Sequence, residues 1–424
     1  MINRIRELLS GIEDNERKKK DEQIIYTLLE KGYFPGLDGI PVIKSAISHI
    51  DGEKGLLTYR GYPVQELAEN CTYEDICYLL VHGELPSYEK WAELRKKLLQ
   101  YKEIDKNVGR VILEMDRKLH PMYMLSAGVL LLQANDPECF EVDHYYNSSK
   151  RALRLIAALP GIIGIFLNRE IDFTNGKEFD SFAQYCLYVF NQEYALDEFW
   201  VDIFEKILIL HADHTMNNST FSVRAVASSK ASIYASIVSA INSLSGPLHG
   251  GANERVIYML EEIGSIDNVE NYINDKLAKK EKIMGIGHRI YKTYDPRSLY
   301  LKNEILPMIF GSGKKIDSSL YELYKIAEKI EEIVLEKFSG KGLYPNVDFW
   351  SGLALKAMGI EPAYFTTIFA MGRIMGWVAH WVEHMEIKNR IFWPEQLYNG
   401  LDTRHLPAER EEEITVSREA AAND

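Results

Sequence analysis

Cysteine is scarce in this sequence of 424 residues. The four cysteines are scattered, and no two of them form a CxxC pair: Cys71, Cys77, Cys139 and Cys186. A disulfide framework or a cysteine-based zinc site needs cysteines at close and regular spacing. We therefore expect neither kind of site, and we infer a reducing compartment.

Uninterrupted apolar runs of membrane-spanning length are also missing. The most apolar long run, residues 364–381, contains Arg373 and His380, so it predicts a buried helix and not a membrane span. The N-terminus lacks the apolar core of a signal peptide, and the acidic Glu7 and Glu13 are atypical of a mitochondrial presequence. We expect a cytoplasmic protein without a membrane partner.

Basic residues are outnumbered by acidic ones, 49 against 62, which gives a formal net charge of −13. The field of such a chain repels nucleic acid, so we expect no nucleic-acid partner, although a local basic patch could bind a phosphate-bearing ligand. Hydrophobic residues make up 46% and charged residues 26% of the sequence. This balance is typical of a globular protein, and the length is sufficient for two domains.

Helical periodicity dominates what the sequence does contain. Only residues 42–62 alternate like strands, and the Asp51-Gly52 corner within them predicts a small β-hairpin. The segments that predict helices are 64–68, 73–81, 86–102, 107–134, 149–169 with a break at Pro160, 193–227 in two segments, 225–244, 254–283, 317–339 and the run from 361.

The decapeptide at residues 245–254, SGPLHGGANE, combines glycines with one histidine, His249. Glycines permit tight turns and close approach of the backbone to a ligand. A helix that starts just after His249 would direct its unpaired peptide N–H groups and positive dipole end at the ring. This arrangement favours a neutral imidazole that donates a hydrogen bond to a developing oxyanion. A structural histidine is the commoner alternative, and this stretch alone leaves both open.

Two further stretches contain candidate ligands for ions. His211 and His214 lie at i and i+3, so on a helix they would share a face that could bind a metal. No third ligand has an evident spacing, and we expect no metal. The turn at 284–288 contains Gly285 and Gly287 and could cradle a phosphate, but the missing third glycine and the missing strand before it argue against a dinucleotide fold.

Asp348 follows Pro345 and precedes two aromatic residues, Phe349 and Trp350. Desolvation in such a setting would raise the pKa and the basicity of the carboxylate, as a proton-abstracting base requires. The alternative is a helix N-cap, which aspartate often provides.

In their order along the chain, five stretches closely resemble the citrate synthase family: HADHTMNNSTF at 211–221, GPLHGGANE at 246–254, GIGHRIYKTYDPR at 285–297, YPNVDFWSG at 344–352 and AMGRIMGWVAHWVEH at 370–384. The hairpin sequence at 50–62 fits the same family, and the resemblance runs from about Gly39 to Gly400. Enzymes of this family condense an acyl-CoA thioester, usually acetyl-CoA, with the keto group of a 2-oxoacid such as oxaloacetate.

The resemblance implies roles for individual residues. Asp348 matches the base, His249 the neutral donor to the thioester oxygen, and His288 the residue that polarises the keto group. The residues that match oxaloacetate and citrate contacts are His214, Arg297 and Arg373. The residues that match the CoA side are Gly285, Ile286, Gly287, Lys292, Lys341 and Asn346. No metal and no redox cofactor is implied, because CoA enters as a thioester substrate.

One position departs from the family pattern. Where the family places an arginine directly before the proline of a late motif, this chain has Trp393 before Pro394. Loss of a guanidinium that binds a carboxylate could cost a few kcal/mol. Arg390 could compensate for it, or the acceptor could be a longer or less charged 2-oxoacid. We expect weaker oxaloacetate binding than in ordinary relatives.

The implied fold is all-α with a short N-terminal β-hairpin. A large helical domain would contain residues 1–250 and 359–424, and a smaller domain, 251–358, would close over the substrates and exclude water. A homodimer is the smallest assembly that the resemblance implies. Three functions stay open at this point: a citrate synthase, a 2-methylcitrate synthase or related enzyme, and a non-catalytic paralogue that binds CoA or a 2-oxoacid.

Overall fold

A computed structural model describes residues 34–137, 139, 145–168, 170–387, 390–396, 398 and 400–407. The predictions based on Glu7 and Glu13 lie outside these ranges. Residues 45–392 form one compact unit, and residues 1–44 together with 393–424 form another. In the second unit, Pro35–Leu37 form a short 3-10 turn. The predicted division into a large domain and a small closing domain at 251–358 stays a prediction.

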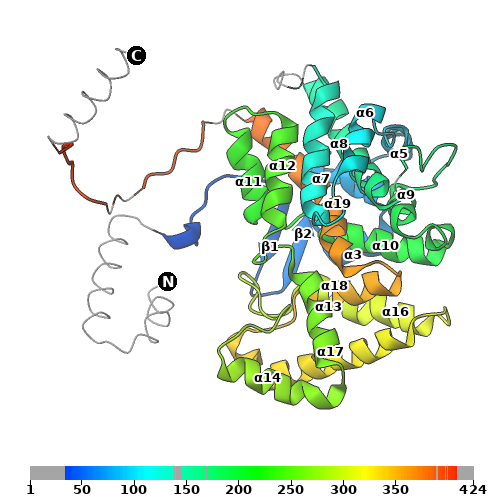
Figure 1. The fold of residues 1–424 in the computed structure, drawn as a ribbon, viewed down its shortest axis with the longest axis vertical. Coiled ribbons are helices and arrows are strands. Elements are labelled where there is room, and N and C mark those ends of the chain that lie inside the picture. The colour runs from blue at the N-terminus through cyan, green and yellow to red at the C-terminus, as the bar shows by residue number, and fades with distance from the viewer. Residues whose placement is uncertain are drawn as a thin grey trace, which may run out of the picture. The chain divides into compact units, whose positions relative to one another are not determined.

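An antiparallel sheet in the order β1-β2-β3 begins the unit of residues 45–392 (Figure 1). Its strands are β1 (Ser48–Asp51), β2 (Leu56–Tyr59) and β3 (Tyr62–Pro63). Asp51 pairs with Leu56, which places the turn between them and agrees with the predicted hairpin. The buried Tyr59 hydroxyl lies 3.0 Å from the carbonyl oxygen of Asp213 and accepts the Asp213 N–H at 3.2 Å. The sheet is therefore tied to the segment that leads into the candidate site.

The rest of the unit is mostly helical, as predicted. The first group of helices is α3 (Val64–Asn70), α4 (Tyr73–His82), α5 (Tyr88–Gln100), α6 (Lys106–Glu114), α7 (Pro121–Leu131), α8 (Tyr145–Asn168), α9 (Phe182–Phe190), α10 (Glu198–His211), α11 (Asn218–Ala227) and α12 (Ile233–Leu244). The second group is α13 (Ala252–Ile263), α14 (Val269–Ala278), α15 (Pro296–Tyr300), α16 (Leu306–Gly311), α17 (Ser318–Phe338), α18 (Val347–Ala357) and α19 (Phe365–Glu386), with a π-helical turn at Leu301–Ile305 between α15 and α16.

Three segments that were each predicted as one helix contain parts of two helices. The segment 107–134 divides into α6 and α7, because His120 caps α7 by accepting the Met122 N–H at 3.3 Å and Pro121 occupies its first position. The segment 225–244 divides at 228–232, where the Ser232 side chain caps α12. The segment 254–283 divides at Gly264, whose left-handed conformation (φ 67°) ends α13.

The predicted break at Pro160 is wrong, since α8 continues through it. Leu159 and Ile162 on either side of the proline are fully buried, so packing outweighs the loss of one backbone hydrogen bond. Within this helix, Lys150–Asn168 is long and apolar enough to cross a membrane, but 78% of the apolar window is buried inside the protein. We interpret this segment as a core helix.

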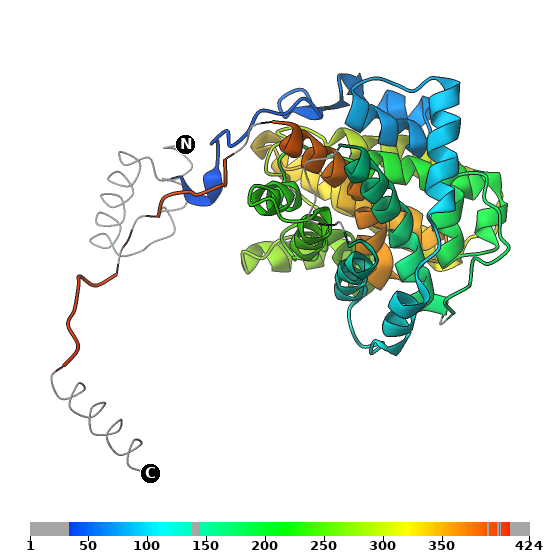
Figure 2. The same cartoon turned by 90° about the horizontal axis from the view of Figure 1, so that it is seen from above.

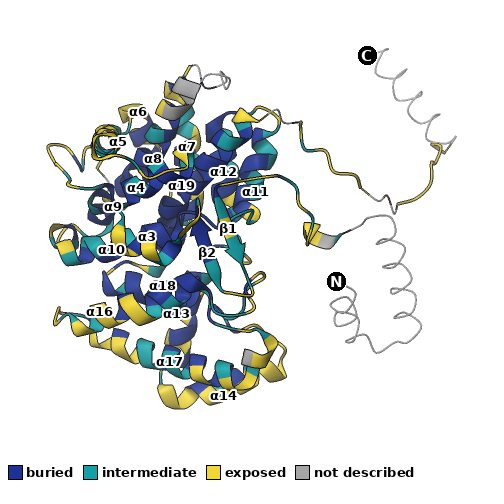
Figure 3. Cartoon of the chain, turned by 180° about the vertical axis from the view of Figure 1, so that it is seen from behind, coloured by how far each residue is buried: buried dark blue, intermediate teal, exposed yellow. Residues whose placement is uncertain are grey.

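Helix α19 is the centre of the packing, and α4, α8, α10, α11 and α12 all contact it (Figures 1 and 2). It is dark blue in Figure 3 because nearly all of its residues are buried, as predicted for the apolar run. Two glycines bring it close to the end of α10. A Cβ atom on Gly372 would lie 2.8 Å from the Leu208 carbonyl oxygen, and one on Gly376 would lie 2.3 Å from that of Ala212. Arg373, between these glycines, is thereby held against the turn that contains His214.

Candidate active site

The turn at residues 211–215 connects α10 to α11. His211 is the last residue of α10 and His214 lies beyond it, so the predicted common helix face for these histidines is wrong. Buried His211 directs its Nδ1 at the Ile207 carbonyl oxygen, 2.7 Å away, within its own helix. Its carbonyl oxygen accepts the Nε–H of Arg373 at 2.6 Å. His211 is thus a structural residue, and its peptide group orients Arg373.

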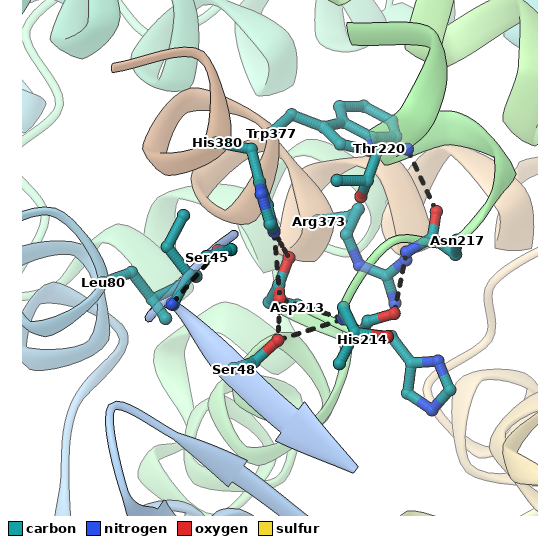
Figure 4. A network of polar contacts seen from close by, with 12 residues as sticks. Ser45, Ser48, Leu80, Asp213, His214, Asn217, Thr220, Arg373, Trp377 and His380 are labelled. Atoms are coloured by element: carbon teal, nitrogen blue, oxygen red, sulfur yellow. Dashed lines mark hydrogen bonds and ion pairs between the residues drawn. The ribbon is translucent and has the colours of Figure 1, made fainter. Parts of the chain in front are cut away.

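A buried carboxylate, Asp213, holds this turn from inside (Figure 4). It accepts hydrogen bonds from the Ser48 hydroxyl and from the Thr215 N–H, the latter at 3.1 Å. His380 Nε2 lies 3.3 Å from the carboxylate, while Nδ1 of the same ring accepts from Arg224 at 2.8 Å. These bonds fix Thr215 in a left-handed conformation (φ 50°), which a β-branched residue seldom adopts.

His214 is the residue that this turn presents to the site. Its ring is buried and lies edge-on to His288, with ring centroids 5.2 Å apart. Its Nε2 is 3.3 Å from the Tyr291 hydroxyl. Burial first, and then the charges of Arg297 and other neighbours, hold its pKa well below the ordinary value. The imidazole is therefore neutral at physiological pH.

His288 lies in the loop between α14 and α15. Its Nδ1 accepts the peptide N–H groups of Ile290 at 3.0 Å and Tyr291 at 3.3 Å. Burial lowers its pKa to about 4, so the ring is neutral, and Nε2 must then carry the proton. The loop fixes His288 as a donor through Nε2–H.

Arg297 begins α15 together with Asp295 and Pro296. Asp295 caps the helix by accepting the Arg297 N–H at 3.0 Å and binds the guanidinium through both carboxylate oxygens, at 3.0 and 2.7 Å. Both side chains are buried. Although burial acts in the opposite direction on each, the attraction between them lowers the pKa of Asp295 and raises that of Arg297. Arg297 is therefore a fixed cation.

Arg373 on α19 is buried, and among the described residues it has no carboxylate bound to it in this way. Its guanidinium lies over the Phe369 ring, 4.8 Å from the centroid, and among the described residues its Nη2 has no hydrogen-bond partner. Burial lowers its pKa to about 10, and Asp213 only partly offsets this effect. A buried cation with an unused donor is suited to an anionic ligand.

His249 lies just before α13, as expected, although the helix begins at Ala252. Its Nε2 accepts the Ser219 N–H at 3.2 Å and contacts the Ser219 hydroxyl at 2.9 Å. Burial, with a smaller contribution from Arg373, lowers its pKa to about 4. The neutral ring therefore has its proton on Nδ1, and no described residue accepts that proton.

Asp348 is the second residue of α18, and the cap is Asn346, whose Oδ1 accepts the Asp348 N–H at 3.0 Å. The N-cap alternative for Asp348 is therefore wrong. The Asp348 side chain is 8% exposed, and within the described chain its Oδ1 has no hydrogen-bond partner. Burial raises its pKa to about 7, although Arg297 and Arg373 lower it. The carboxylate is thus unusually basic.

The glycine-rich turn lies against the segment before α18. The Gly287 N–H donates to the Tyr344 carbonyl at 2.8 Å, and the Asn346 N–H donates to that of Gly285 at 2.9 Å. Asn346 Nδ2 also donates to the Gly287 carbonyl at 3.0 Å, and Ile286 forms a bridge with Pro345. Gly285 (φ 75°) has no room for a side chain, since a Cβ atom would lie 2.8 Å from Val256. The turn is therefore built around the Asn346 backbone, beside Asp348.

Lys292 and Lys341 are exposed. The Lys292 N–H donates to the Gly52 carbonyl at 2.9 Å, which ties this segment to the β1–β2 turn. A Cβ atom on Gly342 would lie 3.3 Å from the Lys292 carbonyl oxygen, so the segment that follows Lys341 lies against that of Lys292. The Lys341 ammonium lies 5.5 Å from the Phe338 ring centroid.

The two arginines connect these separate segments electrostatically. Besides burial, Arg297 lowers the pKa of His288, Arg373 lowers that of His249, and both lower those of His214 and Asp348. One nitrogen or oxygen each of His214, His288 and Asp295 lies within 4.8 Å of the others, a spacing that a metal could use. Both Asp295 oxygens already bind Arg297, so this set favours an anionic ligand over a cation.

Three residues of this site carry no role in the prediction from sequence. They are Ser219, which binds His249; Asp295, which binds Arg297; and Tyr291, which contacts both His214 and His288. All three lie inside the motifs named above, so the sequence did indicate that these residues lie near the site. Their partners depend on the folded backbone, which the motif spacing does not reveal.

Known proteins with similar sequences are citrate synthases. A family model for citrate synthase, C-terminal domain, matches residues 36–395. The citrate synthase of Synechocystis sp. is 36% identical over 397 residues, which are 92% of this chain and 96% of the relative. That of Deinococcus radiodurans is 38% identical over 382 residues, which are 87% of this chain and 96% of the relative.

Solved structures are also similar. The citrate synthase of the archaeon Thermoplasma acidophilum, in a ternary complex with carboxymethyl coenzyme A and oxaloacetate, is 29% identical with a TM-score of 0.80, and the match covers 89% of this chain and 98% of that one. The citrate synthase of Pyrobaculum aerophilum is 36% identical with a TM-score of 0.77, covering 89% and 95%.

Proposed function

This chain belongs to the citrate synthase family of acyl-transferring condensing enzymes, and from that premise we propose that it converts acetyl-CoA, oxaloacetate and water into citrate and CoA. The observation that carries the proposal is Asp348, a buried carboxylate with a raised pKa and a free oxygen within the influence of two buried arginines. The carbonyl-activated α-carbon of a thioester is a weak acid, and its deprotonation needs a base together with a donor to the oxygen.

In the proposed first step, Asp348 removes a proton from the α-carbon of acetyl-CoA. The electron pair moves onto the thioester oxygen, where the His249 Nδ1–H donates a hydrogen bond. Because Ser219 occupies Nε2 of that ring, His249 has no lone pair to turn toward the oxyanion. A neutral donor suits this step, since it stabilises the enolate without first protonating the base.

In the second step, the enol carbon forms a bond with the keto carbon of oxaloacetate. The keto oxygen gains the negative charge, and the His288 Nε2–H would donate a hydrogen bond to it, since peptide groups occupy Nδ1. The alkoxide then becomes the citryl hydroxyl, and the proton that Asp348 removed balances this step. Arg297, Arg373 and His214 would bind the two carboxylates of the acceptor. Water then hydrolyses the citryl-CoA thioester, which breaks the C–S bond and releases CoA as the thiol.

The Gly285–Gly287 turn with Ile286 and Asn346, and the exposed Lys292 and Lys341, would bind CoA. The glycine-rich turn offers close backbone approach, and the lysines offer charge to phosphate groups. Each step is proton transfer or carbonyl addition, so we propose no metal and no redox cofactor. We also propose a cytoplasmic homodimer without nucleic-acid or membrane partners.

A 2-methylcitrate synthase, or a related enzyme with another 2-oxoacid, is the second candidate, and Trp393 favours it. The Trp393 side chain is 83% exposed and belongs to the unit formed by residues 1–44 and 393–424. If no other residue takes over the role of the family arginine, oxaloacetate should bind weakly to this enzyme. We expect Trp393→Arg to lower the KM for oxaloacetate by roughly tenfold, the value of one charged hydrogen bond. A wild-type KM in the usual low range that Trp393→Arg does not change would remove this candidate's support.

Release of free CoA thiol tests both candidates together. Acetyl-CoA and propionyl-CoA would each be combined with a panel of 2-oxoacids, and the specificity constants would be compared. The proposal predicts the highest value for acetyl-CoA with oxaloacetate. Preference for propionyl-CoA would favour the second candidate, and no thiol release with any pair would contradict both.

A further inference from the structure

The proposed mechanism gives Tyr291 no role, although it contacts two histidines of the site. We propose that Tyr291 is a positioning residue that fixes the ring orientation and the tautomer of His214 for binding of the 2-oxoacid. This inference rests on the proposed function, because it concerns the same substrate. It depends on the Tyr291 hydroxyl and on the loop that holds it.

The direction of the hydrogen bond follows from the hydroxyl group. Tyr291 is 1% exposed, and among the described residues the only hydrogen-bond partner of its oxygen is Nε2 of His214, at 3.3 Å. A buried O–H group must donate, because an unused donor costs more than the bond is worth. The Tyr291 O–H therefore donates to Nε2. Nε2 must be the unprotonated nitrogen, and Nδ1 carries the proton of the neutral ring.

The tautomer of His214 decides whether the ring attracts or repels an oxygen of the substrate. With Nδ1–H facing the ligand, His214 donates a hydrogen bond to a carboxylate or keto oxygen. In the other tautomer it would present a lone pair to the same oxygen, and the two would repel each other. Each of the three site histidines would then follow one rule: a protein donor occupies one nitrogen, and the other nitrogen is an N–H donor for the substrate.

Tyr291 can act in this way because its loop is fixed. Its peptide N–H donates to His288 Nδ1 at 3.3 Å, and its ring centroid lies 4.7 Å from that of His288 and 5.7 Å from that of His214. The next peptide group, the Lys292 N–H, donates to the Gly52 carbonyl at 2.9 Å. Gly52 leaves no room for displacement, since a Cβ atom there would lie 2.4 Å from the Ile290 carbonyl oxygen.

Tyr291→Phe removes the hydroxyl and keeps the ring and the peptide bonds to His288. We expect the KM for oxaloacetate to rise by roughly three- to tenfold, the range that one neutral hydrogen bond supports, while the KM for acetyl-CoA changes less than about twofold. Tyr294→Phe is the matched control, because it removes a nearby hydroxyl that bonds Glu331 at 3.2 Å and contacts no site histidine. We expect this control to leave both KM values unchanged.

A spectroscopic readout tests the tautomer without any activity. With histidine side chains labelled by ¹⁵N, the His214 signals, assigned with His214→Asn, should report protonated Nδ1 in the wild type and a mixture of tautomers in Tyr291→Phe. A double-mutant cycle tests whether Tyr291 acts through His214. If it does, Tyr291→Phe should have almost no further effect on the KM for oxaloacetate in the His214→Asn background.

An unchanged oxaloacetate KM, a wild-type His214 protonated on Nε2, or equal increases in both KM values with a lower melting temperature would each overturn the assignment. Absence of condensing activity in the wild type would contradict the proposed function instead. In that case the ¹⁵N signals would still decide whether Tyr291 sets the tautomer.

Discussion

Asp348 at the start of α18 and Glu205 on α10 are both carboxylates whose pKa burial raises, to about 7 and about 8 respectively. Glu205 accepts the Tyr73 N–H at 3.0 Å, and its pKa rises further because the buried carboxylate Glu74 lies near it. Asp348 is instead influenced by the cations Arg297 and Arg373 and has an oxygen without a partner. The two regions thus share a raised pKa and differ in what surrounds it.

A raised pKa alone therefore does not identify a catalytic base. At Glu205 the Tyr73 N–H already binds the carboxylate, and the side chain serves to cap the start of α4. Asp348 instead shares the influence of Arg297 and Arg373 with the neutral imidazoles of the site, and among the described residues Arg373 has an unused donor. Chemistry requires this combination, because a base without a donor for the developing charge achieves little.

The largest effect should come from replacing each carboxylate by its amide. Asp348→Asn removes the base, and we expect kcat to fall by about 10²–10⁴-fold, as for loss of a general base. Glu205→Gln keeps an oxygen that can accept the Tyr73 N–H, and we expect its kcat to stay within about twofold of the wild type. Equal losses in the two variants, measured by thiol release, would erase the proposed distinction.

The second-largest effect should be the pH dependence of kcat/KM, which should follow Asp348 and not Glu205. Asp348 acts as a base only when ionised, and its raised pKa places this ionisation near pH 7. Activity should therefore increase with pH through about 7 and fall about tenfold for each unit below it. The pKa values of His249 and His288, both lowered to about 4, leave these rings neutral above pH 5. An activity that does not change between pH 5.5 and 8 would contradict the assignment of Asp348.

The smallest of these effects concerns stability. In the folded protein Glu205 retains a proton that the unfolded chain releases near its ordinary pKa of 4.5. Its contribution to stability therefore decreases as pH rises from about 4.5 to about 8. Glu205→Gln removes this loss, so we expect the variant to be more stable than the wild type by on the order of 1–3 kcal/mol at pH 8 and nearly equal at pH 5. Urea unfolding at both pH values measures the difference, and a variant that is less stable at pH 8 would contradict it.

Sequence periodicity predicted most helices but not their ends. The break before α7 was predictable from Pro121, since proline favours the first helical position. The continuity of α8 through Pro160 was not, because it depends on burial of Leu159 and Ile162 by other segments. Local propensity cannot include such contacts.

The sequence predicts residues for the candidate site but not their hydrogen bonds. Motif order brought His249, His288 and Asp348 to attention, and the fold places each of them near a buried arginine. Their protonation depends on peptide groups, such as the Ser219 N–H for His249 and the Ile290 N–H for His288. Peptide groups carry no sequence signature, so only the folded backbone reveals which nitrogen is free.

The most direct test of the role of Asp348 is exchange of the acetyl-CoA methyl protons with deuterium from the solvent. A dicarboxylate without a keto group would fill the acceptor site, so that the enol forms but cannot condense, and mass spectrometry would follow deuterium incorporation. We expect exchange by the wild type and by Glu205→Gln, and no exchange by Asp348→Asn with CoA binding nearly unchanged. Exchange retained in Asp348→Asn would contradict the role of Asp348.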